Sequence, residues 1–555
     1  MTRLIGGALS PVSRRELLQR AGLASAAAAA GLGTTSALAE ESNDSEEPTE
    51  LGGSAGRIRR ERAFRLRVKA AIEERAVPIP RHANNGDEAL YPNGIGNHTK
   101  GLPHNSIGEV DPAAYGKLLD AFESGDPADF DAIPLGGTVR LANPQGGLAF
   151  TMQGCDSAQL SIPPAPALAS AERAAEMVED YWMALLREIP FSQYGKEPIS
   201  TAAIDELNRL SGFTGPKVGG QVTPESLFRG TSPGDLIGPF ISQFLLLPVR
   251  FGAINVSQKY NTYVPNLDYL TDFPSWLACQ NGQGPFALNT ISGTTSYIKN
   301  GRDLSAYDHV DYAAQPTVTA LLWLLRNSMP FHPGNPYRSS VNQAGGPTFG
   351  NQHIFSLLYE ASIRASRAVF FEKWQVHRTV RPEAFGGLVH NTLTGAANYP
   401  LHRDVLNSDA VSRVFRKYGW YLLPHNDPEG CPAHPAYAAQ HAATLGAQVT
   451  ALKAFFDESA VIPNPVMPSD DGQSTPPYTG AGTVPLTVGG ELNKLASNIS
   501  LGRDFEAVHW RSDSWQGLLL GEACAISVLR DQRRMYNEPF TGFTFTSFEG
   551  KPVTV

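Results

Sequence analysis

The stretch GRDFEAVHWRSD, residues 502–513, places a cation, an imidazole and an acid inside a long segment of helical hydrophobic periodicity, 491–532. His509 and Asp513 are four residues apart, so on a helix they share one face. Arg503 and His509 are six residues apart, which separates them by about 120° on an ideal helix. Both can face one pocket only if the backbone bends or a helix ends between them.

A second stretch, KWQVHRTVRPEAFGG at 373–387, carries Lys373 and Arg381 in a helical pattern that we expect Pro382 to end. On a continuous helix the two cations would lie about 12 Å apart along the axis and about 80° apart in rotation. Their side chains are long enough to span this separation and meet over one point.

A third stretch, HPAYAAQHAATLGA at 434–447, is apolar enough to begin a buried helix but carries His434, Gln440 and His441. A lone histidine in such a setting is usually a hydrogen-bonded core residue. A functional role therefore depends on whether the other two stretches converge on this one.

If the three stretches converge, they bring Lys373, Arg381 and Arg503 together. Cations without matching acids repel one another unless an anion lies between them, and guanidinium groups suit the oxygens of phosphate or vanadate. One histidine could then act as a nucleophile or metal ligand and another as a general acid–base. Asp513 could fix the tautomer and orientation of His509. Taken singly, each helix would present ordinary surface cations.

The remaining chain predicts a mainly α fold of bundled helices. Apolar residues recur at three- and four-residue intervals in every long segment from residue 171 onward. Residues 76–170 are rich in Gly, Pro and Asn and predict a long irregular wrap, whereas the alternating C-terminus, 540–555, predicts a short hairpin. The predicted helical segments are 171–189, 316–328, 353–378, 438–456 and 491–532.

The N-terminus resembles an export signal. Arg14 and Arg15 precede a short run of small apolar residues, and SALA offers a cleavage site at Ala39. The paired arginines favour the twin-arginine route, and an alanine-rich helical tail is the alternative. We therefore expect a signal peptide at 1–39, a disordered linker at 40–56 and a helical domain at 57–555, which places the mature protein in the periplasm or outside the cell.

Composition excludes several classes of function. The 555 residues carry a net charge of −9 and a pI near 5.8, which argues against nucleic acid as the main partner. No later run reaches the ~20 apolar residues of a membrane span. The basic segment 57–75 could touch a membrane surface, but a solvated helix is favoured.

The four cysteines include no CxxC spacing, and one or two disulfides are possible after export.

Together the three stretches resemble the superfamily of type 2 phosphatidic acid phosphatases and vanadium haloperoxidases. The pattern K-x7-RP, a histidine-bearing helix start and R-x5-H-x3-D, with NKLASN and GLLLGE, is most similar to the algal-type vanadium bromoperoxidases. This resemblance covers about residues 350–535. It implies an all-α fold of paired four-helix bundles with additional helices, and a homo-oligomer.

The resemblance also implies a cofactor, vanadate, and a role for each motif residue. His509 would coordinate vanadium, His441 would be the acid–base histidine, and His434 would lie near the site. Lys373 would in addition polarise bound peroxide. The residues that would bind the vanadate oxygens are Lys373, Arg381 and Arg503.

One departure from the family pattern concerns the helix start. The family has Pro-Ser-Gly-His where this chain has Ala438-Ala439-Gln440-His441. Ala439 cannot donate the hydroxyl that the serine gives to an oxyanion oxygen. Losing a hydrogen bond to a charged group costs roughly 1.5–3 kcal/mol, or one to two orders of magnitude in affinity, unless the Gln440 amide compensates.

The implied reaction is oxidation of a halide by hydrogen peroxide to a hypohalous species, which halogenates organic compounds. An acid phosphatase is the alternative, with His509 as the nucleophile and His441 protonating the leaving alcohol. A third possibility is a non-catalytic oxyanion-binding relative. The K-x7-RP spacing, His434 and the glycine before Arg503 favour the peroxidase.

Overall fold

A computed structural model describes residues 54–284, 286–312, 314–480 and 484–555 of the chain. Its contacts divide the chain into two units, with the boundary between Arg67 and Val68. The basic helix expected over 57–75 is present as α2 (Ser54–Ala76), which runs through this division. The predicted signal peptide and most of the predicted linker lie outside the described residues.

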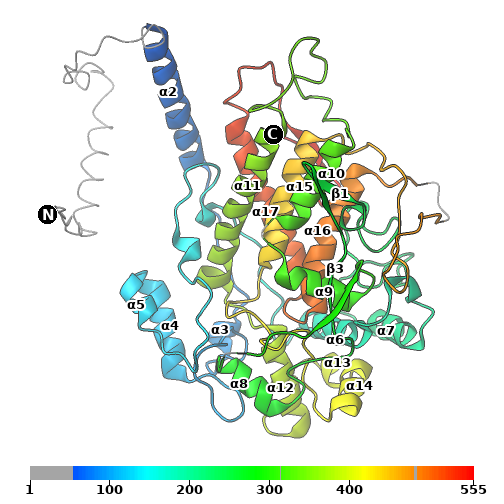
Figure 1. The fold of residues 1–555 in the computed structure, drawn as a ribbon. Coiled ribbons are helices and arrows are strands. Elements are labelled where there is room, and N and C mark those ends of the chain that lie inside the picture. Colours follow the sequence, from blue (N-terminus) through cyan, green and yellow to red (C-terminus); the bar gives the residue numbers. More distant parts are fainter. Residues whose placement is uncertain (1–53, 285, 313, 481–483) are drawn as a thin grey trace, which may run out of the picture. The chain divides into compact units, whose positions relative to one another are not determined.

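The second unit is built from helices, so the predicted all-α class is confirmed (Figure 1). Four helices pack against one another at its centre: α11 (Asn351–Phe371), α15 (Gln440–Phe455), α16 (Val488–Phe505) and α17 (Arg511–Gln532). All residues of α15 from Ala442 to Phe455 are buried, which makes this the central helix. The long helical pattern 491–532 is thus two helices, with the break at the charged stretch.

Two glycines allow α15 and α17 to cross closely. A Cβ at Gly446 would overlap the carbonyl oxygen of Leu518, and one at Gly521 would overlap that of Ala443. The two backbones therefore touch directly, with no side chain between them. This contact fixes the beginnings of both helices relative to each other.

The other elements surround this centre. The sequence reveals the longer helices but not the strand pairs between residues 249 and 296, whose strands are only three to six residues long. The remaining α-helices are α3 (Asp87–Leu90), α4 (Pro112–Ser124), α5 (Pro127–Asp131), α6 (Ala171–Leu186), α7 (Pro198–Arg209), α8 (Phe273–Gln280), α9 (Gly301–Val310), α10 (Gln315–Arg326), α12 (Pro382–Thr394), α13 (Arg403–Leu406) and α14 (Asp409–Tyr418).

The strands form three antiparallel pairs in the described part of the chain. They are β1 (Val249–Phe251) with β2 (Ile254–Val256), β3 (Tyr260–Tyr263) with β4 (Ile291–Ser296), and β5 (Thr544–Thr546) with β6 (Pro552–Thr554). The last pair is the predicted C-terminal hairpin, in which Phe545 faces Val553.

The irregular segment predicted over 76–170 contains only short helices besides α4, and its loops are tied to the region where α11 ends and α12 begins. The backbone N–H of His98 donates to the Arg378 carbonyl at 2.8 Å. Lys100 forms a buried ion pair with Glu383 at 2.9 Å, and Glu88 pairs with Arg378 at 2.5 Å. Because unpaired buried charges are costly, these pairs fix the loops to the helices.

No helix in the described ranges has both the length and the apolar character that crossing a bilayer requires.

Replacing Gly446 by Ala should destabilise the protein by about 1–3 kcal/mol or more, because the new Cβ would force α15 and α17 apart. Gly116→Ala in α4 is the matched control, since a Cβ there meets nothing within 4 Å. It should be neutral or stabilise by up to about 1 kcal/mol. Urea unfolding of the two variants measures the difference, and equal stabilities would contradict the close crossing.

Candidate functional site

Three helices begin at one place in the second unit. Arg381 is the N-cap residue of α12, Ala439 that of α15 and Trp510 that of α17. The Ala439 N–H donates to the carbonyl of Asp513 at 3.0 Å, and an Arg381 Nη1–H donates to the carbonyl of Val508 at 2.7 Å. Helix N-termini carry partial positive charge and free N–H groups, so their meeting point favours an anion.

The predicted end of the helix that carries Lys373 is wrong. We expected Pro382 to end the helix that carries Lys373, but α11 ends earlier, in a π-helical turn, η6 (Glu372–His377), and Arg378 has a left-handed φ of 41°. Pro382 instead occupies the first turn of α12. Proline suits this position because its φ is already helical and the first turn needs no N–H.

His509 lies in the connector between α16 and α17, and both of its ring nitrogens have partners. Nδ1–H donates to Asp513 Oδ2 at 2.7 Å, so Nε2 is left as the acceptor of an Arg381 Nη1–H at 3.0 Å. Burial, followed by the charges of Arg381, Lys373 and Arg503, lowers the pKa of His509 well below its ordinary value. The ring is therefore neutral, with the Nε2 lone pair directed at the cations.

Lys373 and Arg381 are almost completely buried. The Lys373 ammonium donates to the carbonyls of Pro435 and Ala436 at 2.8 and 2.7 Å. Burial and the charge of Arg381 lower the pKa of Lys373 well below its ordinary value. An anion among these groups would offset the repulsion between them.

We considered the three cations as having no matching acids, and for Arg503 this is wrong. It pairs with Glu506 at 2.6 Å, and the carboxylates of Asp308 and Asp311 add negative charge around it. Its Nε is nevertheless buried without a partner in the described residues. The side chain thus keeps one donor that an oxyanion could use.

His434 and His441 occupy different environments. His434 is buried, and its Nδ1 accepts from an Arg381 Nη2–H at 2.9 Å, while burial, Arg381 and Lys373 lower its pKa well below the ordinary value. His441 is 29 % exposed and its Nε2 lies 3.0 Å from Asp311 Oδ1. His441 alone of the two has a carboxylate partner and access to solvent.

The helix start of α15 lacks a side-chain cap because Ala439 has no hydroxyl. Gln440 is half-buried beside it, in the first turn. The free N–H groups of this turn therefore have no side-chain acceptor at the N-cap.

Two partners at the site were not expected from the sequence. His98 comes from the N-terminal irregular segment and is buried, and its Nε2 has no partner in the described residues. Burial, followed by the charges of Arg381 and Lys373, lowers the pKa of His98 well below its ordinary value. Asp311 follows α9 and contacts His441. Motif spacing could not identify either residue, because each lies in a loop that is distant in sequence from the three motif stretches.

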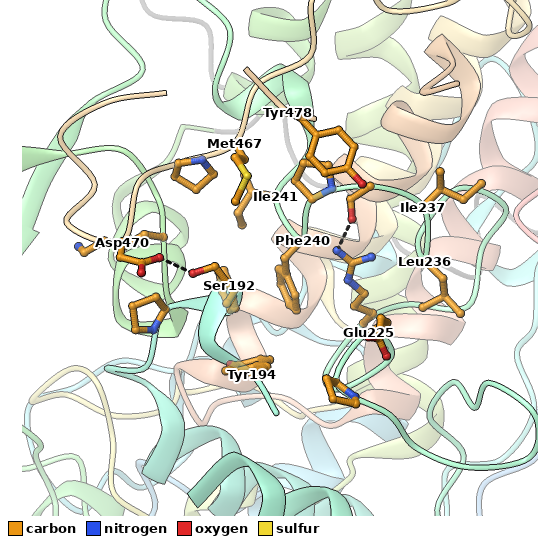
Figure 2. Close-up of a pocket in the computed structure, with 18 of the residues that line it drawn as sticks. Ser192, Tyr194, Glu225, Leu236, Ile237, Phe240, Ile241, Met467, Asp470 and Tyr478 are labelled. Carbon is orange, nitrogen blue, oxygen red and sulfur yellow. Dashed lines mark hydrogen bonds between the residues drawn. The ribbon is translucent and has the colours of Figure 1, made fainter. Parts of the chain in front are cut away.

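A cavity lies away from these residues. Figure 2 shows a cavity of about 550 Å³ lined by Tyr194, Phe240, Met467 and Asp470, among others. None of the predicted site residues lines it. All four cysteines are free thiols in this structure, and none of the disulfides that the sequence left possible is formed.

The fold and site define an α-helical protein in which buried cations surround a neutral histidine, an arrangement that suits an oxyanion. No family profile matches the chain. A curated relative, the vanadium-dependent bromoperoxidase of Ascophyllum nodosum, is 35% identical over 538 residues, covering 92% of this chain and 94% of the relative. The vanadium-dependent bromoperoxidase of Corallina pilulifera is 33% identical over 89% of this chain and 98% of its own length.

A solved structure agrees with these relatives. The homohexameric second vanadate-dependent bromoperoxidase of Ascophyllum nodosum aligns with a TM-score of 0.87 at 33% identity, over 95% of both chains. The chain belongs to the vanadium-dependent bromoperoxidase family.

Asp513→Asn should weaken binding of orthovanadate about 10- to 100-fold, the usual cost of losing the partner that orients a metal-binding histidine. The amide can donate to Nδ1 and so favour the tautomer that carries its proton on Nε2. Equilibrium titration of the metal-free protein with orthovanadate measures the change. Unaltered affinity would show that the contact between His509 and Asp513 does not set the tautomer.

Proposed function

We propose that this chain oxidises halide ions with hydrogen peroxide when vanadate is bound, and releases a hypohalous species that halogenates small organic compounds. The observation that carries the proposal is the neutral ring of His509, with its Nε2 lone pair facing buried cations. Membership of the vanadium-dependent bromoperoxidase family supports it.

The residues present fit vanadate. Positive charge and N–H donors for its oxygens come from Lys373, Arg381 and Arg503. The Arg503 Nε has no partner in the described residues and could donate to one of these oxygens. His509 Nε2 supplies a nitrogen ligand whose tautomer is fixed by Asp513. Bound vanadate would act as a Lewis acid toward peroxide and would not change oxidation state in the cycle.

His441 is the residue suited to move protons. Its contact with Asp311 orients the ring, and its partial exposure gives it access to water and to incoming peroxide. Two carbonyls hold the Lys373 ammonium at the site, and its remaining N–H would be available to polarise peroxide. His434 holds Arg381 in place through the Nη2 contact.

The assembly and the location are further proposals. We infer a homo-oligomer, because the solved relative is described as homohexameric. We also infer export through the twin-arginine route, supported by Arg14, Arg15 and the cleavage site ending at Ala39.

His509→Ala and His441→Ala should separate anion binding from turnover. The first should abolish turnover and weaken vanadate binding by at least 10- to 100-fold, because the ring nitrogen ligand is lost while the cations remain. The second should lower turnover about 10²- to 10⁴-fold, the usual share of general acid–base catalysis, and leave vanadate affinity within a few-fold. Halide-dependent peroxide consumption with and without orthovanadate measures turnover, with p-nitrophenyl phosphate as a parallel substrate. Phosphate release without halide oxidation would favour the phosphatase.

Ala439→Ser should strengthen vanadate binding by about one order of magnitude, since a hydroxyl at this helix start can donate to an oxyanion oxygen. It should also raise stability by about 1 kcal/mol as an N-cap residue. Titration and unfolding of the same variant separate the two effects. If stability rises and affinity does not, the hydroxyl caps the helix without reaching the anion.

A further inference from the structure

Helix α6 presents one row of charged side chains to the residues that follow His509. Arg173, Glu176 and Glu179 are spaced by three residues and so lie along one face. The Arg173 guanidinium lies over the Trp510 ring, 4.2 Å from its centroid. Glu176 Oε1 accepts from the Ser512 N–H at 2.7 Å. This face therefore contacts the start of α17 at consecutive positions.

Glu179 forms the strongest of these contacts. Its two carboxylate oxygens accept from Arg511 Nε at 2.7 Å and Arg511 Nη2 at 2.5 Å. Arg511 Nη1 also donates to the carbonyl of Arg229 at 2.9 Å. Both partners are buried, and such a two-point pair fixes direction as well as distance. Arg511 is thereby held in one orientation, two residues after His509.

The connector that carries His509 needs such support. It turns at Ala507, whose φ of 75° is left-handed and unfavourable for a residue with a side chain. Within the described ranges the ring forms hydrogen bonds to two residues of the site, Asp513 and Arg381. Its direction depends on where α17 begins, and the α6 side chains fix that beginning.

We propose that Glu179 is a positioning residue for His509, acting through Arg511. The inference rests on the proposed function, because it concerns the same ring nitrogen. Glu179 makes no hydrogen bond to Lys373, Arg381 or Arg503 among the described contacts. Its loss should therefore misdirect the ring and leave these three cations in place.

Two oxyanions distinguish positioning from a general loss of structure. Orthovanadate can bond to a ring nitrogen, whereas inorganic phosphate is held by the cations without that bond. Glu179→Gln in the full chain should therefore weaken orthovanadate binding about 10- to 100-fold and change phosphate binding less than about threefold. Calorimetric titration of the metal-free protein with each anion gives both affinities.

Glu491→Gln is the matched control. Glu491 forms a buried ion pair with Lys494 at 2.6 Å, near the other end of α16 from Arg503. It should lower stability in the same way without changing the ratio of vanadate to phosphate affinity. Vanadate affinity of Glu179→Gln within twofold of the unaltered protein would overturn the proposal. An equal loss of both anions would also overturn it.

If Glu179→Gln does not fold, Arg511→Lys takes its place, because it keeps the charge but loses the two-point contact. The same change in the affinity ratio is expected and the same results would overturn the proposal. The unaltered protein tests the proposed function separately. If it binds vanadate yet oxidises no halide, the proposed function fails, while the affinity ratio still decides the role of Glu179.

Discussion

The site depends on keeping one imidazole neutral among cations. Burial and the charges of Lys373, Arg381 and Arg503 all disfavour a proton on His509 Nε2, and the carboxylate of Asp513 holds the remaining proton on Nδ1. The same cations that would repel a protonated ring attract an oxyanion. A single electrostatic arrangement therefore prepares both the nitrogen ligand and the anion site.

The meeting of helix starts supplies the framework for this arrangement. A backbone hydrogen bond joins the N-termini of α15 and α17, and the Arg381 side chain joins that of α12 to the connector before α17. Helices α15 and α17 also cross without intervening side chains. Ala439 removes one donor from this framework but none of the charges. The chain thus has the buried cations of the site and no hydroxyl at the N-cap of α15.

The three motif stretches lie together in the structure, and spacing within each short stretch was enough to single them out. The spacing of Arg503 and His509 required a bend or a helix end between them, and the structure has the end of α16 and a connector there. The path from Lys373 to Pro382 was predicted wrongly, because a hydrophobic pattern does not reveal a left-handed residue such as Arg378. The roles of these residues toward vanadate stay predictions.

The partners of the motif residues could not be predicted. Asp311 meets His441 across 130 positions of sequence, and Glu179 meets Arg511 across 332 positions. Such contacts depend on the packing of whole helices, and no periodicity within either segment encodes them. His98 likewise enters through a segment whose composition predicts only loops.

The attachment of the N-terminal loops to the start of α12 has a consequence for how the protein acquires its site. Glu88, His98 and Lys100 bond to residues 378–383, nearly three hundred positions later, while His509 comes from near the other terminus. Closing such long loops is slow and all-or-none in character. The site therefore needs contacts from distant parts of the chain, and a chain shortened to its helical centre would leave Glu383 buried without its ammonium partner.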